Sequence, residues 1–157
     1  MRHGFLSYAH DDYDYAKAFV DHLATSKGHG GADFWWDAAI AGGQNWSQEI
    51  ADAINKAEVF VLLATSGFLK SDYIMKTERP AIEARARQCG GLIVSVILGY
   101  FVWEPHFGQY QVVPSEKGRV KPIRDFKPHE KGYNTAHRAL LGAIKAHPWP
   151  VVTVHTP

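Results

Sequence analysis

Two apolar segments constrain the fold of this chain more than any other feature. Val59–Ala64 is apolar at every position, and Leu92–Leu98 is apolar at every position but Ser95. Strands of this kind are typical of a parallel sheet with both faces covered, whereas half-exposed strands alternate apolar and polar residues. The apolar run that continues to Trp103 is shorter than the roughly 20 residues that span a bilayer. We therefore interpret both segments as core strands.

Segments with helical periodicity alternate with the strands along the chain. Further strands are predicted at 5–7 and 32–36, with a short edge strand at 120–123, and helices are predicted at 11–25, 46–56, 71–88 and 133–147. Pro80 lies inside the third of these helices and predicts an irregular turn or a break near Arg79, because proline lacks the backbone N–H. The alternation predicts an α/β fold, a flavodoxin-like three-layer sandwich whose parallel sheet of about five strands carries helices on both faces.

Composition narrows the class of protein. The 157 residues are enough for one domain, expected over 1–147, with 148–157 as a linker or the start of a following domain. Lys and Arg number 17 against 16 Asp and Glu, so charge favours neither nucleic acid nor a membrane as partner. The single cysteine, Cys89, excludes an internal disulfide, and residues 1–4 do not resemble a signal peptide. We expect a cytoplasmic location.

Unusual residues cluster where the predicted strands end. In parallel sheets of this class, ligands bind at the carboxyl ends of the strands, near the point where the strand order reverses. Here that edge would hold residues 7–12, 37–46, 66–78 and 99–103. A ligand site is expected there.

Three ordered motifs carry a family resemblance. Phe5-Leu6-Ser7-Tyr8-Ala9-His10 covers the first strand, Asp37–Trp46 is the loop after the second, and Val59–Ala64 followed by Ser66–Tyr73 covers the third strand and the approach to the next helix. Together they resemble the TIR (Toll/interleukin-1 receptor) domain in its bacterial, NAD-consuming form. The resemblance covers roughly residues 4–146.

The resemblance implies an enzyme that cleaves nicotinamide from NAD⁺, giving ADP-ribose or a cyclic isomer, with NAD⁺ as substrate and no cofactor. It implies Glu78 as the catalytic residue. The family often has an aromatic residue four positions before that glutamate. In this chain Ile74 lies four positions before Glu78, and Tyr73 lies five positions before it. The substrate-binding residues that we infer are Ser7, Tyr8, Ala9, His10, Asp37, Trp46, Ser71 and Tyr73.

Each of these residues also has a plain structural interpretation. Glu78 could be a solvated helix carboxylate, with Glu83 as an alternative catalytic residue. Trp46 could only pack at the start of its helix and Ser71 could only cap one, while Asp37 could bond to its own loop. The nine histidines show no metal-ligand spacing, so no metal is expected.

Three other functions compete. TIR domains also act as adaptors that assemble through surface loops without catalysis, and this remains the main alternative. A phosphorylated receiver domain is disfavoured because the third strand runs into Ala64-Thr65-Ser66, with no aspartate to accept phosphate. A nucleoside deoxyribosyltransferase is disfavoured by the loop at 37–46. The resemblance further implies activation by self-association through that loop, a C-terminal sensor domain in the full-length protein, and a role in antiviral defence.

Overall fold

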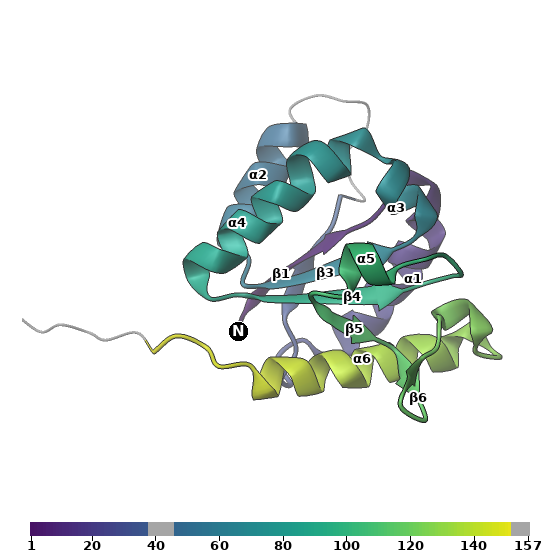
Figure 1. Ribbon diagram of the computed structural model, residues 1–157. Coiled ribbons are helices and arrows are strands. Elements are labelled where there is room, and N and C mark those ends of the chain that lie inside the picture. Colours follow the sequence, from purple (N-terminus) through teal and green to yellow (C-terminus); the bar gives the residue numbers. More distant parts are fainter. Residues whose placement is uncertain (38–45, 152–157) are drawn as a thin grey trace, which may run out of the picture.

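A five-stranded parallel sheet in the order β2-β1-β3-β4-β5 forms the centre of the molecule (Figure 1). The computed structural model describes residues 1–37 and 46–151, with Trp46 and Ser47 as backbone only. The strands are β1 (His3–Ser7), β2 (Asp33–Trp35), β3 (Val59–Ala64), β4 (Leu92–Ile97) and β5 (Gln111–Val113). All four neighbouring pairs are parallel, which confirms the predicted fold class.

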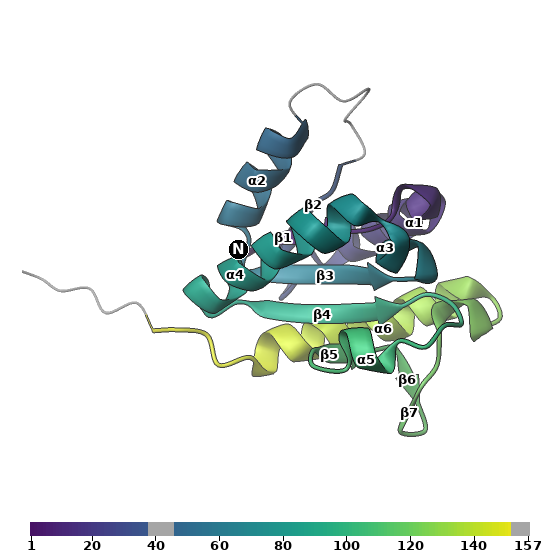
Figure 2. The ribbon, with the colours of Figure 1, turned by 45° about the horizontal axis from the view of Figure 1, so that its top comes forward.

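Helices cover both faces of this sheet (Figures 1 and 2). One face carries α1 (Tyr13–Leu23) and α6 (His129–Ala146), and the other carries α2 (Trp46–Lys56), α4 (Arg79–Cys89) and the short helices α3 (Ser66–Lys70) and α5 (Glu104–Phe107). Three 3-10 turns, η1 (His10–Asp12), η2 (Ala24–Ser26) and η4 (Ile123–Asp125), complete the connections together with the π-helical turn η3 (Ile74–Glu78).

Two separate cores hold these layers together. Alternate residues of β3 point to opposite faces, so that Val61 and Leu63 join the core under α1 and α6, while Phe60 and Leu62 join the core under α2 and α4. Every residue of β3 is buried, which explains why this strand is apolar throughout.

The irregularity predicted around Pro80 is confirmed. Residues Ile74–Glu78 form a π-helical turn that runs directly into α4, and Pro80 is the second residue of α4. The proline ring would crowd the carbonyl four residues earlier in a regular helix, and the wider π turn gives it room. This turn presents Glu78 at the junction between η3 and α4.

Two predicted boundaries were wrong. The fifth strand is β5, not residues 120–123: Val120 lies in the two-stranded hairpin of β6 (Ser115–Glu116) and β7 (Arg119–Val120), and Ile123 begins η4. β5 has only three residues, too few to show a period. The last helix begins at His129, four residues earlier than expected, directly after Pro128.

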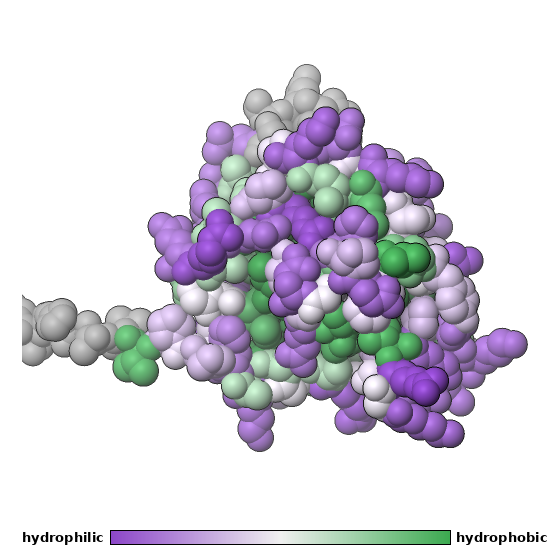
Figure 3. Space-filling model, in the orientation of Figure 1, coloured by the Kyte–Doolittle hydropathy of each residue, from purple (hydrophilic) through white to green (hydrophobic). Residues whose placement is uncertain are grey.

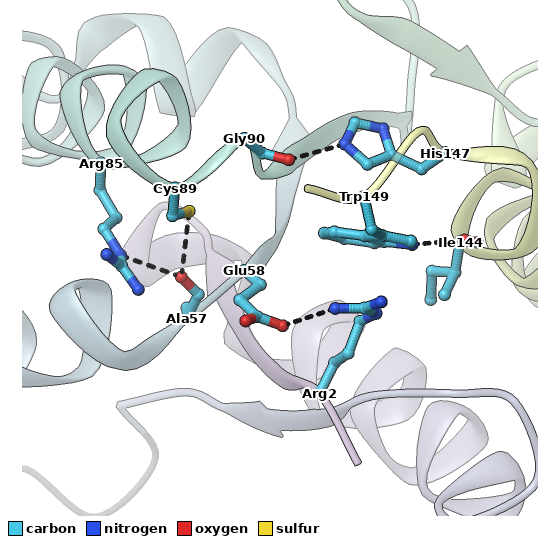
Figure 4. Close-up of polar contacts among 9 residues, drawn as sticks. All are labelled: Arg2, Ala57, Glu58, Arg85, Cys89, Gly90, Ile144, His147 and Trp149. Carbon is cyan, nitrogen blue, oxygen red and sulfur yellow. Dashed lines mark hydrogen bonds and ion pairs between the residues drawn. The ribbon is translucent and has the colours of Figure 1, made fainter. Parts of the chain in front are cut away.

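The end of the described chain folds back on the amino-terminal edge of the sheet (Figure 4). The guanidinium of Arg2 lies 3.7 Å from the ring centroid of Trp149 and donates to the Glu58 carboxylate over 2.9 Å. The Trp149 indole N–H donates to the carbonyl of Ile144, and His147 Nε2 bonds to the carbonyl of Gly90 over 2.8 Å. We call Arg2, Glu58, His147 and Trp149 the C-terminal clasp.

The surface of the face that carries α4 and α5 is mostly hydrophilic, with hydrophobic residues visible between the two helices (Figure 3). Among the large hydrophobic side chains of the described residues, Met1, Tyr100, Val102 and Val151 are exposed. Within residues 1–37 and 46–151, no helix combines the length and the apolar character needed to cross a membrane.

Candidate active site at the carboxyl edge of the sheet

The candidate site is centred on a hydrogen bond between residues 71 positions apart. Ser7 is the last residue of β1, and its Oγ donates to Oε1 of Glu78 over 2.5 Å. Both side chains are buried, with 1% of Ser7 and 7% of Glu78 exposed. β1 lies between β2 and β3, where the strand order reverses, so the contact lies at the position expected for a ligand site.

The protein environment changes the acidity of Glu78. Burial raises the pKa of this carboxyl group from 4.5 to about 7, the Ser7 hydrogen bond opposes the shift, and repulsion from the Asp37 carboxylate adds to it. The group therefore titrates near neutral pH. Perturbed carboxyl groups of this kind are enriched at functional sites, although structural networks also produce them.

Asp37 approaches the same place from the other side of β1. It follows β2 by two residues and is half-buried. Burial, and then the nearby Asp37 carboxylate, raise the pKa of the Tyr8 phenol. Oδ1 of Asp37 is buried and has no hydrogen-bond partner in the described part of the chain.

Tyr73 lies near both carboxylates. Its side chain is half-buried, and burial, then Glu78, then Asp37 raise the pKa of its phenol. The structure therefore brings together five of the nine predicted site residues, namely Ser7, Tyr8, Asp37, Tyr73 and Glu78.

The other four predicted residues lie differently. The side chain of His10 is exposed, and Ala9 is buried with its carbonyl accepting from the Asp12 N–H over 2.8 Å. Ser71 Oγ accepts from the Ile74 N–H over 3.3 Å, as a helix cap does. Trp46 begins α2, and its side chain lies outside the described residues, as does the predicted assembly loop from residue 38 to 45.

Sequence reasoning missed the buried Arg79, next to Glu78. Its guanidinium donates to the carbonyl of His106 and to Glu83 over 3.3 Å, and lies 4.9 Å from the Phe107 ring centroid. These contacts anchor the start of α4 to α5 and direct the positive charge of Arg79 away from Glu78. An arginine on a helix is usually solvated, so the sequence carried no signal for this role.

The chemistry of the cluster is acidic and aromatic. Among the described residues no group of three or more His, Cys, Asp or Glu side chains could hold a metal ion. A carboxyl group in such a place can stabilise positive charge that develops on a substrate, and aromatic rings can stack on a flat one.

A family model described as "TIR domain" matches residues 5–129. The match spans most of the chain and includes the last three residues of β1, all of β3 and the turn that carries Glu78. The chain belongs to the TIR domain family.

Two individual proteins are also similar to this chain. This TIR domain is 26% identical over 140 residues to y4lF, an uncharacterised protein of Sinorhizobium fredii (strain NBRC 101917 / NGR234), with 88% of this chain covered. The match spans only 42% of the length of that relative. The crystal structure of a prokaryotic SEFIR domain superposes with a TM-score of 0.58 over 99% of this chain and 100% of that one, at 15% identity, and supports the fold alone.

Proposed function

We propose that this TIR domain is an NAD⁺ nucleosidase, which breaks the bond between nicotinamide and ribose in NAD⁺ with Glu78 as the catalytic residue. The observation that carries the proposal is the Glu78 carboxyl group, buried at the strand-order reversal and held by Ser7. A helix carboxylate with no role in the site would be expected at the surface.

Cleavage of the nicotinamide–ribose bond requires an ionised carboxylate rather than a proton donor. When the C1′–N bond of NAD⁺ breaks, both bonding electrons go to the pyridinium nitrogen, so nicotinamide leaves as a neutral molecule without a proton. Positive charge remains on the ribose, shared between C1′ and the ring oxygen. The ionised Glu78 carboxylate stabilises this charge, as glycosidase carboxylates do.

The intermediate is then captured by a nucleophile. Water that adds to C1′ gives ADP-ribose, and the proton that it loses passes to Glu78 or to solvent. If a nitrogen of the adenine ring in the same molecule adds instead, the product is a cyclic isomer. Glu78 serves both outcomes.

The neighbouring residues position the reactants. Ser7 orients the Glu78 carboxyl group through its hydrogen bond, and the half-buried Tyr73 ring offers aromatic surface near it. The backbone after β1, at Ala9 and His10, is assigned to the pyrophosphate or adenosine side of the substrate.

Self-association is the activating step in this proposal, with residues 37–46 at the contact between subunits. We assign the domain to antiviral defence as an NAD⁺-depleting effector in a longer protein with a C-terminal sensor. What supports this is the family membership and the greater length of the matched relative.

The test is mass analysis of the products formed from NAD⁺ by the protein clustered on a surface. Wild-type protein is expected to release nicotinamide, and Glu78→Gln to lose about 100-fold or more of that rate, in line with removal of one group that stabilises transition-state charge. The exposed Glu130 of α6 provides a matched control, since Glu130→Gln is expected to retain the wild-type rate. No turnover by clustered wild-type protein, with assembly intact, would identify a non-catalytic interaction module.

A further inference from the structure

Arg79 is a buried arginine that directly follows the proposed catalytic residue. Only 8% of its side chain is exposed. Its guanidinium donates to the carbonyl of His106, to Glu83 over 3.3 Å and to Sδ of Met75 over 3.9 Å. These partners belong to α5, α4 and η3, so this one side chain ties three elements together.

Two aromatic rings complete the surroundings of the guanidinium. The ring centroid of Phe107 lies 4.9 Å from Cζ of Arg79, and that of Tyr110 lies 5.5 Å from it. Burial of a charged group costs free energy, and an apolar side chain of similar volume often fills such a place at least as stably. An arginine supplies directed hydrogen bonds, which an apolar side chain does not. Stability alone therefore does not account for the guanidinium.

The backbone of Arg79 belongs to the same connection. Its N–H donates to the carbonyl of Ile74 and closes the π-helical turn η3, whose last residue is Glu78. A π turn holds about one residue more than an α-helical turn, so relaxation to an α-helix would rotate Glu78 by roughly 100° about the helix axis. That rotation would take the carboxyl group away from Ser7 Oγ, which lies 2.5 Å from it. The position of Glu78 thus depends on a turn that Arg79 holds by its backbone and by its side chain.

We propose that Arg79 is a positioning residue, which holds the Glu78 carboxyl group against Ser7 by tying η3 and the start of α4 to α5. Its importance for turnover rests on the proposed function, whereas its control over the place of Glu78 rests on these contacts. The guanidinium acts through the backbone and not through its charge, because in the described part of the chain it pairs with Glu83 and not with Glu78. The two modes of action predict opposite changes at Glu78 when Arg79 is replaced.

The test follows the Glu78 carboxyl group by 13C NMR in Arg79→Met, with glutamate labelled at Cδ and the Glu78 signal assigned by its loss in Glu78→Gln. In wild-type protein, burial raises the pKa of Glu78 from 4.5 to about 7. In Arg79→Met the carboxyl group is expected to move toward water, so its pKa should fall toward 4.5. A direct effect of the lost positive charge would raise the pKa instead. Asp37, Tyr8 and Tyr73, which interact electrostatically with Glu78, are unchanged in the variant.

Arg85→Met is the matched control. Arg85 lies further along α4, and its Nε donates to the carbonyl of Ala57 over 3.2 Å, so it also ties this helix to a neighbouring segment (Figure 4). Its replacement should leave the titration of Glu78 unchanged. If Arg79→Met fails to fold, Arg79→Lys provides the same test, because lysine keeps the positive charge but lacks the planar fork that bonds in several directions. The pKa of Glu78 should fall in that variant too, by a smaller amount.

Turnover separates this inference from the proposed function. In clustered protein, Arg79→Met is expected to lower kcat for NAD⁺ about 10- to 100-fold and to change KM by less than about twofold, because the displaced carboxylate no longer meets the reacting ribose. An ordinary pKa of Glu78 in wild-type protein, or one that stays near 7 or rises in both variants of Arg79, would overturn the inference whether or not NAD⁺ is cleaved. The expected fall in pKa, with no nicotinamide released by clustered wild-type protein, would sustain the inference and contradict the proposed function.

Discussion

At the scale of single residues, Glu78 is a source of instability as well as the proposed centre of catalysis. Its folded-state pKa of about 7 exceeds the ordinary 4.5, so between these values the folded protein binds more protons than the unfolded chain. The stability that the neutral carboxyl group provides is complete below pH 4.5 and is lost as the pH rises through 7. At higher pH the folded state holds an unfavourable buried charge.

Glu78→Gln is therefore expected to stabilise the protein at alkaline pH. The shift of the pKa corresponds to about 3 kcal/mol at most, so we expect the free energy of unfolding at pH 8 to rise by about 1–3 kcal/mol. The gain should shrink toward pH 5, where glutamine and protonated glutamate are alike in charge. Urea unfolding at pH 5, 6.5 and 8 measures it, with Glu130→Gln as the control. A gain that does not vary with pH would contradict this explanation.

The site was partly predictable at this scale. Ser7, Tyr8, Asp37, Tyr73 and Glu78 were all selected from motifs, and the structure brings these five together. The Ser7–Glu78 hydrogen bond was not predicted, because its length depends on how β1 and η3 pack across 71 positions. The Ser71 cap was one of two interpretations that the sequence left open, and the structure shows that contact.

At the scale of elements, α1 and α6 are joined by a contact between the half-buried His22 and the buried His137. His137 Nε2 lies 2.7 Å from Ser26 Oγ, and His137 Nδ1 lies 3.0 Å from His22 Nδ1. Because the Ser26 hydroxyl already donates to the Leu23 carbonyl, His137 Nε2 must donate to Ser26. Nδ1 of a neutral His137 then accepts from His22. Burial, His22 and Arg138 lower the pKa of His137, so the neutral form is favoured.

His137→Gln is expected to reveal this arrangement through its pH dependence. At pH 8 the variant should lose about 1–3 kcal/mol of stability, because it disrupts buried hydrogen bonds. Since the folded-state pKa is lowered, the contribution of His137 is complete above its unfolded-state value near 6.5 and is lost as the pH falls below it. The difference between wild type and variant should therefore shrink from pH 6.5 to pH 5. Denaturant unfolding measures the difference, the exposed His29→Gln is the control, and a constant difference would argue against neutral His137.

Elements differed in how far the sequence predicted them. β3 and β4 were predicted at nearly their observed bounds, because burial on both faces requires apolar residues throughout. β5 was not predicted, because its three residues follow an aromatic segment and precede Pro114. Only pairing with β4 makes them a strand. Short edge strands depend on long-range contacts that local patterns do not contain.

At the scale of the whole molecule, the two edges of the sheet have different roles. The carboxyl edge carries the Ser7–Glu78 hydrogen bond, and the amino edge carries the C-terminal clasp. Residues 148–150 were predicted to be part of a linker, a domain boundary that stays a prediction. In the structure they nevertheless make specific contacts with the folded unit, including Pro150 against Gly90.

Trp149→Ala is expected to destabilise the fold by about 1–3 kcal/mol, because it removes a half-buried ring together with the stacked Arg2. The clasp lies at the opposite edge from Glu78, so NAD⁺ turnover well below the melting temperature should stay unchanged. Thermal unfolding and the turnover assay measure the two effects. Val151→Ala is the control, since 89% of Val151 is exposed. An unaltered melting temperature would mean that the clasp contributes nothing to stability.

The clasp also determines where the backbone departs. With Pro150 held against Gly90, just before β4 begins, Val151 departs on the side remote from Ser7 and Glu78. Copies tethered to a bead or scaffold after Val151 would crowd together with the carboxyl edges of their sheets pointing outward. A bulky reporter fused after this position would leave the edge that carries Ser7 and Glu78 unobstructed.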